Sequence, residues 1–381
     1  MNPADRPQGR RGARICFVAP NAYSVLKQDT DHGFMGGAEL QQALIGEELA
    51  KRGYSVSFIT MRHGREETER LGPFEVFTTY GPDEGIPVLR FVHPRLTRLW
   101  RALVQSDADL YFVRGATFRL APVVYFARRA GRKVVFSGAD DPDFDPKSVK
   151  IQYLRDRLLY FWGLRRCDAI TVQNRWQQRS LRENFGRDAP IIHNGFRRVE
   201  APSSSPGHDV LWVAKILRRK RPQWLLELAK GIPDASFVMI GGQSRASATE
   251  SAFYREVEAR ARPIPNLRFK GFLAFGEVEK EFDNARIFVN TSEHEGFPNT
   301  FLQAWSRGVP VISFVNPDEL LERHQLGLVV KSLDELIRKV RDVLEGRIVF
   351  DRARIKAFYE ENFLLENVVD RYERVFRSVL T

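Results

Sequence analysis

The sequence has few cysteines and no long apolar run, and both shortages narrow the class of protein. Among its 381 residues there are two cysteines, Cys16 and Cys167, and each lies in an apolar or strand-like segment. No metal cluster can be built from two thiols, and we expect both to be reduced and buried, as in a cytosolic protein. No stretch approaches the ~20 continuous apolar residues of a membrane-spanning helix. Residues 1–14 contain no apolar segment of signal-peptide length.

Signatures of nucleic-acid and dinucleotide binding are also missing. The chain has no zinc-finger spacing and no aromatic RNA-binding signature, so we predict no nucleic-acid partner. Its glycines form no GxGxxG motif, which leaves a nicotinamide cofactor without support. The formal net charge is nevertheless +11, and this basic excess favours an anionic partner such as a nucleotide diphosphate or a membrane surface.

What the sequence does contain is an alternation of short apolar runs and helical stretches. The runs cover residues 14–19, 55–60, 109–113, 133–136 and 169–172 in the first half, and 210–214, 236–240, 267–271, 286–290 and 309–313 in the second. Continuous apolar strands separated by helices indicate parallel sheets buried on both faces. The predicted fold class is therefore α/β, with two Rossmann-like, doubly wound parallel-sheet domains.

Polar stretches divide these elements into domains. Residues 202–207 are small and flexible and make the best linker candidate, which places one domain at residues 1–200 and another at 201–355. Residues 356–381 form a C-terminal helical segment that we expect to pack back on the first domain. A polar link, residues 20–35, follows the first strand and exceeds the usual length of about 2–6 residues.

Residues 291–313 carry the first candidate site. They read as strand end, loop, helix and next strand, with Glu295 and Gly296 in the loop. We expect the helix to begin at Asn299, a good N-cap residue, and to stop at Gly308, which tolerates the left-handed conformation. A helix N-terminus attracts anions, so a carboxylate beside it suits a ligand with both phosphate and hydroxyl groups, such as a nucleotide sugar. The alternative is an ordinary crossover with a solvated glutamate.

Two further loops have compositions that are typical of ligand binding. Residues 215–222 include Lys215 and Lys220 among a run of cations at the end of a predicted strand, where they are placed to hold phosphate. A solvated charge run is the other interpretation. Gly36 and Gly37 open the first long helix, and they either contact a ligand or allow close packing of helix and strand.

An acidic cluster and a basic helix leave more than one interpretation open. Residues 137–145 place Asp140, Asp141 and Asp143 after a predicted strand. Asp140 is the preferred hydroxyl-binding or base residue, and Asp141 with Asp143 is a candidate metal-binding pair. Helix capping and turn formation explain the same residues. Residues 150–166 predict an amphipathic helix rich in arginine, which suits either a domain surface or contact with an anionic membrane.

In this order and at these spacings, the motifs resemble those of retaining glycosyltransferases of family 4, which have the GT-B fold. The resemblance covers nearly the whole chain. The elements that carry it are Gly36-Gly37-Ala38-Glu39, His193-Asn194-Gly195, Lys215 with Lys220 five residues on, Glu295-Gly296-Phe297-Pro298, and the closing Gly308-Val309-Pro310-Val311-Ile312.

Three departures from the family pattern are visible. Gln303 stands where the second glutamate of the glutamate-x7-glutamate motif belongs, and in the family that glutamate holds the ribose hydroxyls. An amide still donates and accepts hydrogen bonds, so the change Gln303→Glu should tighten or preserve nucleotide binding. Lys215 replaces the usual arginine and offers a point charge instead of a bidentate fork. Residues 137–141 stand where the family has a histidine, so the acceptor side of the site departs from the family pattern.

The resemblance implies two Rossmann-like domains that face each other across a cleft, the second holding the donor and the first the acceptor. It implies sugar transfer, with retention at the anomeric carbon, from a UDP- or GDP-linked donor. The implied acceptor is a glycan or a lipid-linked molecule in cell-surface polysaccharide biosynthesis. No cofactor and no metal are expected, because lysines do the work of a cation. The expected location is cytoplasmic, with peripheral contact at an anionic inner-membrane surface as a further expectation.

The resemblance also assigns a role to each candidate residue. Catalytic roles fall to Glu295, Lys220, Lys215 and Asp140. The donor-binding residues are Lys215, Lys220, Gly241, Glu295, Gly296, Phe297, Thr300 and Gln303, and the acceptor-binding residues are Gly36, Gly37, Glu39 and Asp140. Three alternatives stay open: a nucleotide-sugar-binding protein without transferase activity, a GT-B-like epimerase or hydrolase, and a metal-dependent transferase with Asp141 and Asp143 as ligands.

Overall fold

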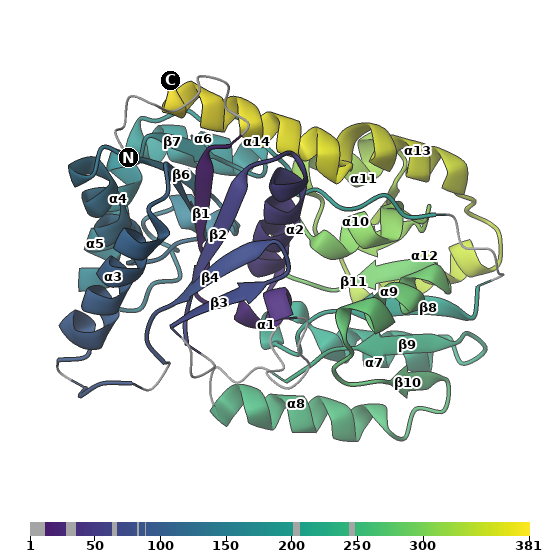
Figure 1. The fold of residues 1–381 in the computed structure, drawn as a ribbon. Coiled ribbons are helices and arrows are strands. Elements are labelled where there is room, and N and C mark those ends of the chain that lie inside the picture. The colour runs from purple at the N-terminus through teal and green to yellow at the C-terminus, as the bar shows by residue number, and fades with distance from the viewer. Residues whose placement is uncertain are drawn as a thin grey trace. The chain divides into compact units, whose positions relative to one another are not determined.

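The computed structural model describes residues 12–27, 36–62, 67–81, 84–87, 89–200, 206–243 and 248–381. These residues form two compact α/β units (Figure 1). The first contains the described residues of Met1–Lys27, Met35–His193 and Leu365–Thr381, and the second contains those of Asn194–Leu364. The sequence placed the boundaries at 200/201 and 355/356, whereas the units meet at 193/194 and 364/365. Most of the linker candidate 202–207 lies outside the described residues.

The first unit is built on a seven-stranded sheet in the order β3-β4-β2-β1-β5-β6-β7. Its strands are β1 (Arg14–Val18), β2 (Ser55–Thr60), β3 (Thr68–Leu71), β4 (Phe74–Thr78), β5 (Leu110–Arg114), β6 (Lys133–Ser137) and β7 (Ala169–Thr171). Neighbouring strands run parallel except β3 and β4, which pair antiparallel at the edge. The predicted doubly wound parallel sheet is confirmed. The edge hairpin was not predicted, because Glu69, Arg70 and Glu75 interrupt its apolar pattern.

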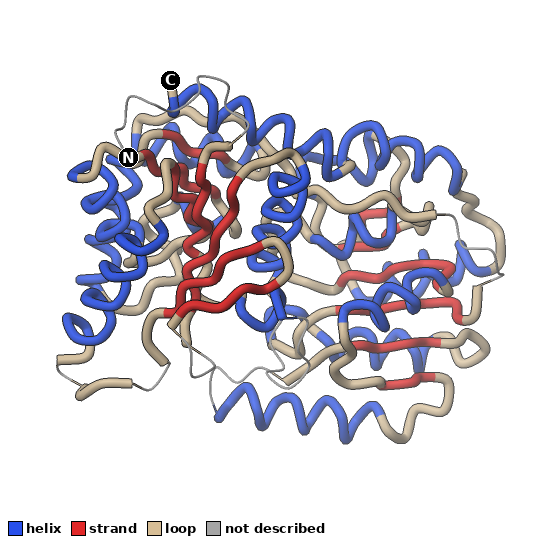
Figure 2. The backbone as a smooth tube through the Cα atoms, viewed as in Figure 1, coloured by secondary structure: helices blue, strands red, loops and turns tan. Residues whose placement is uncertain are grey.

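Helices cover both faces of this sheet (Figures 1 and 2). They are α1 (Tyr23–Lys27), α2 (Gly37–Lys51), α3 (Thr97–Ser106), α4 (Leu120–Arg129), α5 (Leu154–Arg166), α6 (Arg175–Phe185) and α14 (Leu365–Leu380). Helices α3, α4 and α5 lie on one side of the sheet, and α2 and α14 lie on the other. The short helix α1 falls within the link that the sequence suggested was simply polar. Residues 28–35 of that link lie outside the described residues.

The last helix, α14, belongs to the first unit although it is distant in sequence. Its Tyr372 and Phe376 are buried, and their rings lie 5.6 and 5.9 Å from the ring of Phe112 in β5. Arg52, at the end of α2, forms ion pairs with Asp370 at 2.6 Å and with Glu373 at 2.7 Å. Apolar burial and these ion pairs together fix α14 on the sheet.

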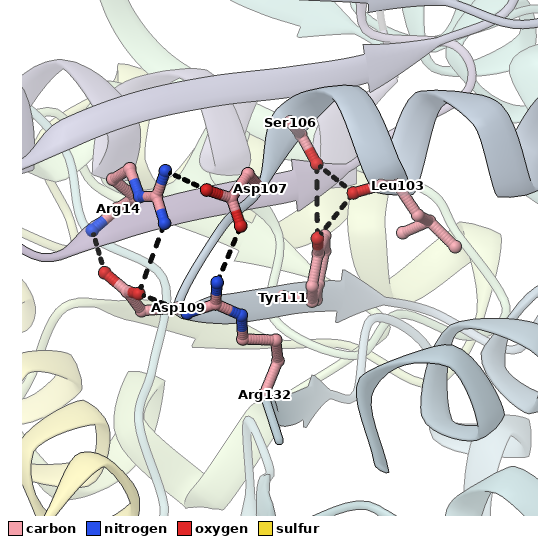
Figure 3. Close-up of polar contacts among 7 residues, drawn as sticks. All are labelled: Arg14, Leu103, Ser106, Asp107, Asp109, Tyr111 and Arg132. Atoms are coloured by element: carbon pink, nitrogen blue, oxygen red, sulfur yellow. Dashed lines mark hydrogen bonds and ion pairs between the residues drawn. The ribbon is translucent and has the colours of Figure 1, made fainter. Parts of the chain in front are cut away.

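Two arginines and two aspartates form a closed network at the edge where β1, β5 and β6 begin (Figure 3). The backbone N–H of Arg14 donates to Asp109 at 2.9 Å, and the Arg14 side chain pairs with Asp107. Arg132 pairs with Asp107 at 2.6 Å and with Asp109 at 2.8 Å. Because the charges at this edge balance one another, an anionic ligand finds no excess charge there among the drawn residues.

The second unit is built on a six-stranded, wholly parallel sheet in the order β10-β9-β8-β11-β12-β13. Its strands are β8 (His208–Val213), β9 (Phe237–Ile240), β10 (Leu267–Phe269), β11 (Ala285–Asn290), β12 (Val311–Ser313) and β13 (Gly327–Val329). Its helices are α7 (Pro222–Gly231), α8 (Ala248–Ala261), α9 (Phe275–Asp283), α10 (Asn299–Trp305), α11 (Leu320–Arg323), α12 (Leu333–Leu344) and α13 (Arg352–Phe363). Its core includes Trp212, Phe237 and Ile287.

Strand order locates the ligand-binding edge of each sheet. In the second unit the order reverses between β8 and β11, and in the first between β1 and β5. Ligands of open α/β sheets bind beyond the carboxyl ends of the strands at such a reversal. The loops after β8 and β11 are therefore where a ligand of the second unit is expected.

Both cysteines are free and buried, as predicted. Burial raises the pKa of Cys16 to about 12 and that of Cys167 to about 11, so both are thiols at neutral pH. Within the described residues, none of the helices combines the length and the apolar character needed to cross a membrane.

Candidate functional site

The loops that follow β8 and β11 are joined to each other at the ligand-binding edge of the second unit. The backbone N–H of Glu293 donates to the Arg219 carbonyl at 2.9 Å. The Thr291 hydroxyl donates to the Lys220 carbonyl at 2.6 Å and accepts from the Trp212 indole N–H at 2.9 Å. These bonds run from a buried tryptophan in the core strand β8 to both loops, and they fix the loop backbones relative to the sheet.

Lys220 and Glu295, two of the predicted catalytic residues, are in direct contact. The Lys220 Nζ pairs with Glu295 Oε1, and the Ser292 hydroxyl donates to the same oxygen at 2.7 Å. The two side chains are 12% and 15% exposed. Partial burial strengthens this charge pair relative to a surface pair. The site thus places a carboxylate and a cation side by side at this edge of the sheet.

Lys215 and Gly241 lie on neighbouring strand extensions at the same edge. Lys215 sits between Ala214, whose N–H donates to Ile240 at 3.1 Å, and Ile216, whose N–H donates to Gly242 at 3.2 Å. A Cβ atom at Gly241 would come within 2.3 Å of the Ala214 carbonyl oxygen. Only glycine permits this close approach, so the residue serves backbone packing whatever else it contacts.

The start of α10 differs from its predicted form. The helix begins at Asn299, as predicted, but the residue at the cap position is Pro298, so the prediction that Asn299 caps the helix is wrong. The Asn299 Oδ1 instead accepts from the Asn194 side-chain amide at 2.8 Å, and that amide also donates to the Phe297 carbonyl at 2.7 Å. Asn194, from the His193-Asn194-Gly195 element, thereby fixes the loop that precedes α10. Gly308 has φ 68°, which confirms the predicted left-handed turn after α10.

Phe297, Gly296 and Thr300 lie around this loop in different environments. The Phe297 ring is buried, 5.4 Å from the ring of Phe363, so its side chain belongs to the core of the unit. Gly296 is buried and Thr300 is half-buried at the first turn of α10. Of these three residues, Thr300 offers a side-chain hydroxyl at the helix start.

Gln303 is buried, and its side-chain amide donates to Glu279 Oε1 at 2.6 Å. The other oxygen of Glu279 pairs with Arg307 at 2.9 Å, and Arg307 also pairs with Asp283. Burial raises the pKa of Glu279, and the nearby Arg307 charge opposes that shift. Sequence reasoning missed Glu279, which is one of three glutamates in α9 and carries no local signal that it faces position 303.

The acidic cluster of the first unit serves as a helix cap. Asp140 caps the 3-10 helix Asp141–Phe144, and the Asp143 carboxylate accepts from the backbone N–H groups of Ala139 at 2.8 Å and Asp140 at 3.1 Å. Burial raises the pKa of Asp143 to about 6. The Asp140 carboxylate also contacts Lys150 Nζ. The capping interpretation therefore accounts for Asp143 without a ligand.

The carboxylates of the candidate metal-binding pair, Asp141 and Asp143, accept hydrogen bonds from protein groups. Asp141 Oδ1 accepts from the side chains of Asn174 at 2.8 Å and Gln177 at 3.1 Å, while Asp143 accepts the backbone bonds described above. Across the described ranges, no three His, Cys, Asp or Glu side chains are arranged to hold a metal ion.

The predicted acceptor residues at the start of α2 are placed together in the first unit. Gly36 is buried at the cap position, Gly37 is exposed, and Glu39 is half-buried. A Cβ atom at Gly36 would come within 1.7 Å of Glu39 Oε2, so the Glu39 side chain folds back over Gly36. A side chain at position 36 would therefore displace the Glu39 carboxylate from this place.

Comparison with known families agrees with this arrangement. Residues 207–346 match the model of the glycosyl transferases group 1, and residues 35–198 match that of glycosyltransferase family 4. A stretch of 188 residues is 22% identical to the UDP-N-acetylglucosamine–peptide N-acetylglucosaminyltransferase GtfA subunit of Streptococcus pneumoniae, covering 45% of this chain and 36% of that relative. The chain thus spans little more than a third of the length of that relative.

Solved structures share the architecture of nearly the whole chain. The sucrose-phosphate synthase of Thermosynechococcus elongatus superposes with a TM-score of 0.74 at 17% identity, covering 96% of this chain and 99% of that one. Anabaena HepE, in complex with UDP and glucose, gives the same TM-score, identity and coverage. The fold is therefore GT-B, the two-domain fold of a large class of glycosyltransferases. Within that class, the chain belongs to the group 1, family 4 glycosyltransferases.

Proposed function

We propose that the protein transfers a sugar from a UDP-linked donor, held by the second unit, to an acceptor held by the first. The contact between Lys220 and Glu295 carries the proposal, because it sets a cation for the diphosphate beside a carboxylate for sugar hydroxyls at the strand-order reversal. The complexes of Anabaena HepE with UDP and with UDP-glucose support a UDP-linked donor.

The proposed chemistry depends on stabilising the departing diphosphate. Negative charge grows on the diphosphate as its bond to the anomeric carbon breaks, and Lys215, Lys220 and the backbone N–H groups near Thr300 stabilise that charge. Lysines supply positive charge without a metal ion, so we propose a metal-independent reaction. Gln303 contacts the ribose in this scheme.

Glu295 and Asp140 complete the scheme. Glu295 orients the sugar hydroxyls and favours positive charge at the ring in the transition state. Asp140 binds the acceptor hydroxyl and takes its proton as the acceptor oxygen bonds to the anomeric carbon. We propose that the new bond forms on the face from which the diphosphate leaves, so that configuration is retained.

The acceptor proposed here is a glycan or a lipid-linked molecule of cell-surface polysaccharide synthesis. Helix α5 supports contact with an anionic membrane, because Leu154 and Leu158 are 70% and 62% exposed on a helix that also carries Arg155, Arg165 and Arg166. Leu158→Asp should reduce co-sedimentation with anionic vesicles if α5 makes this contact. Unchanged co-sedimentation would remove α5 from the membrane interface.

The change Lys220→Ala tests the donor site. We expect UDP to bind about 10- to 150-fold more weakly, because one charge-assisted contact is worth about 1.5–3 kcal/mol. The measurement is calorimetric titration with UDP, and thermal melting checks that the variant is folded. Lys230→Ala is the matched control, since Lys230 pairs with Glu227 on the surface of the same unit. Equal affinities for wild type and Lys220→Ala would refute the assignment of the diphosphate site.

Release of free nucleotide (UDP or GDP) from a panel of UDP- and GDP-sugars separates a transferase from a hydrolase and from a binding protein, and analysis of the recovered nucleotide sugar detects an epimerase. A transferase releases the nucleotide only when an acceptor is added, a hydrolase releases it without one, and a binding protein does not release it. Added chelator should leave the rate unchanged, whereas a loss of activity would support the metal-dependent alternative.

A further inference from the structure

Three arginines from separate segments gather around one tyrosine in the first unit. Arg62 follows β2, Tyr80 follows β4, Arg119 immediately precedes α4 in the loop after β5, and Arg95 belongs to the helical turn Phe91–Leu96. Because β2, β4 and β5 are parallel strands of one sheet, the loops that follow them lie at the same edge. That edge is the ligand-binding edge of an open α/β sheet. We call Arg62, Arg95 and Arg119 the arginine cluster.

Tyr80 is the centre of the arginine cluster and is 3% exposed. Arg119 Nη2 donates to the Tyr80 hydroxyl, and the Arg119 Cζ lies 5.5 Å from the centre of the Tyr80 ring. The Arg95 Cζ lies 5.7 Å from the same ring centre. The backbone N–H of Arg62 donates to the Tyr80 carbonyl at 3.0 Å, and Arg62 Nη2 donates to the Thr79 carbonyl at 3.5 Å. Neutral partners therefore hold all three guanidinium groups.

Carboxylates close to the arginine cluster are committed to other arginines. Glu84 pairs with Arg98 at 2.7 Å, and Asp156 pairs with Arg155 at 2.8 Å. Within the described residues, no carboxylate oxygen lies within ion-pair distance of a guanidinium of the cluster. The structure thus concentrates positive charge at this edge, in contrast to the balanced network at the opposite edge (Figure 3).

The guanidinium groups are also incompletely bonded. The Nε atoms of Arg62 and Arg95 are buried and have no hydrogen-bond partner among the described residues. Burial lowers the pKa of Arg119 and the charge of Arg95 acts in the same direction, while Tyr80 and the more distant Asp156 oppose the shift without reversing it. Buried like charges that form no ion pair among the described residues destabilise a fold, and a bound anion would reduce that cost.

We propose that the arginine cluster binds a phosphoryl group of the acceptor substrate. A carboxylate presents two oxygens and one negative charge, which one guanidinium fork satisfies. A phosphate presents three oxygens and nearly two negative charges, which match several forks at once. The inference deepens the proposed function, because it rests on the acceptor being held by the first unit and names the acceptor as a phosphorylated molecule.

The test measures anion binding to the full chain with UDP present at saturation, so that the donor site is occupied. The probes are inorganic phosphate, inorganic pyrophosphate, a hexose phosphate, and vesicles that contain phosphatidic acid. We expect Arg62→Gln and Arg95→Gln each to weaken binding at least tenfold. Arg101→Gln is the matched control, since it removes the same charge from an arginine that pairs with Glu67 on the surface.

Thermal melting separates a binding role from a structural one. Removing one of several mutually repelling charges should leave the melting temperature of Arg95→Gln unchanged or higher, while phosphate no longer raises it. A lower melting temperature with phosphate stabilisation intact would overturn the proposal, and so would equal affinity for the wild type, Arg62→Gln and Arg95→Gln.

The arms of the experiment also identify the source of the phosphate. Binding of the soluble phosphates points to a free phosphorylated sugar, and binding of vesicles alone points to a lipid phosphate. Failure of the wild type to bind UDP would refute the proposed function. The arginine-cluster variants can still be compared in that case, with the soluble probes titrated into the Lys220→Ala background.

Discussion

Replacing Gln303 with glutamate puts a second carboxylate against Glu279. The Gln303 amide now donates to Glu279 at 2.6 Å, and a glutamate at 303 both loses that bond and brings two negative charges into contact. The resemblance alone predicted that the change tightens or preserves nucleotide binding. The hydrogen bond changes that expectation, because losing it first destabilises the contact between α9 and α10.

The magnitude follows from the contact. Two unit charges about 4 Å apart repel by about 4 kcal/mol at an effective dielectric constant of about 20. Arg307, 2.9 Å from Glu279, offsets part of this repulsion. Uptake of a proton by one of the two carboxylates limits the remaining repulsion. We expect Gln303→Glu to destabilise the second unit by about 2–3 kcal/mol near pH 8, which corresponds to a shift of about two pKa units in one carboxyl group.

The pH dependence gives the sign of the effect. Burial already raises the pKa of Glu279 in the folded protein above its value in the unfolded chain. A carboxyl group with a raised folded pKa stabilises the fold fully below the unfolded pKa and loses that contribution as pH rises through the folded pKa. The loss in Gln303→Glu should therefore be smaller at pH 5 than at pH 8, because protonation of one carboxyl removes the repulsion.

Hydrogen exchange of the α9 and α10 amides is the assay, because a two-unit protein need not unfold in one step. Gln303→Leu is the control that removes the bond without adding charge. The double change Glu279→Gln with Gln303→Glu exchanges the two groups and should restore most of the protection. A loss that is equal at both pH values, or a double variant no better than Gln303→Glu, would refute the reasoning.

Two further predictions concern pH in opposite directions. Burial raises the pKa of Asp143 to about 6, so the first unit should lose up to about 3 kcal/mol of stability as pH rises from about 4 to about 6. Hydrogen exchange in residues 137–145 measures this loss, and Asp143→Asn should abolish its dependence on pH. A slope that persists in the variant would exclude Asp143 as its source. Burial lowers the pKa of His208 to about 4, so the second unit should lose up to about 3 kcal/mol of stability as pH falls from about 6.5 to about 4. His208→Gln should remove this loss from a plot of unfolding free energy against pH. An unchanged loss in the variant would contradict the assignment to His208.

Much of the fold could be predicted from the sequence because strands buried on both faces leave continuous apolar runs. β1 and β8 are of this kind, and each is buried over most of its length. The contact between Lys220 and Glu295 could be predicted as well, although they are 75 residues apart, because each follows a strand next to the reversal point. Strand order thus converts distant motifs into neighbours.

The remaining features depend on tertiary contacts that local sequence does not encode. β3 and β4 are held by pairing with the sheet, and their charged residues hide the strand pattern. Asn299 is a good cap by propensity, but Asn194 engages its side chain. Glu279 meets Gln303 only because α9 and α10 lie side by side, so neither helix predicts the pair by itself.

The placement of α14 reverses the expected order of folding during synthesis. The ribosome makes the chain from its N-terminus, so residues 12–193 emerge long before the helix that buries Phe112 and pairs with Arg52. All described strands of the second unit are made before α14, so the second unit can complete its sheet and pack its core before the first unit does. A nascent chain without Leu365–Leu380 therefore exposes the apolar face of the first sheet that Tyr372 and Phe376 cover in the folded protein.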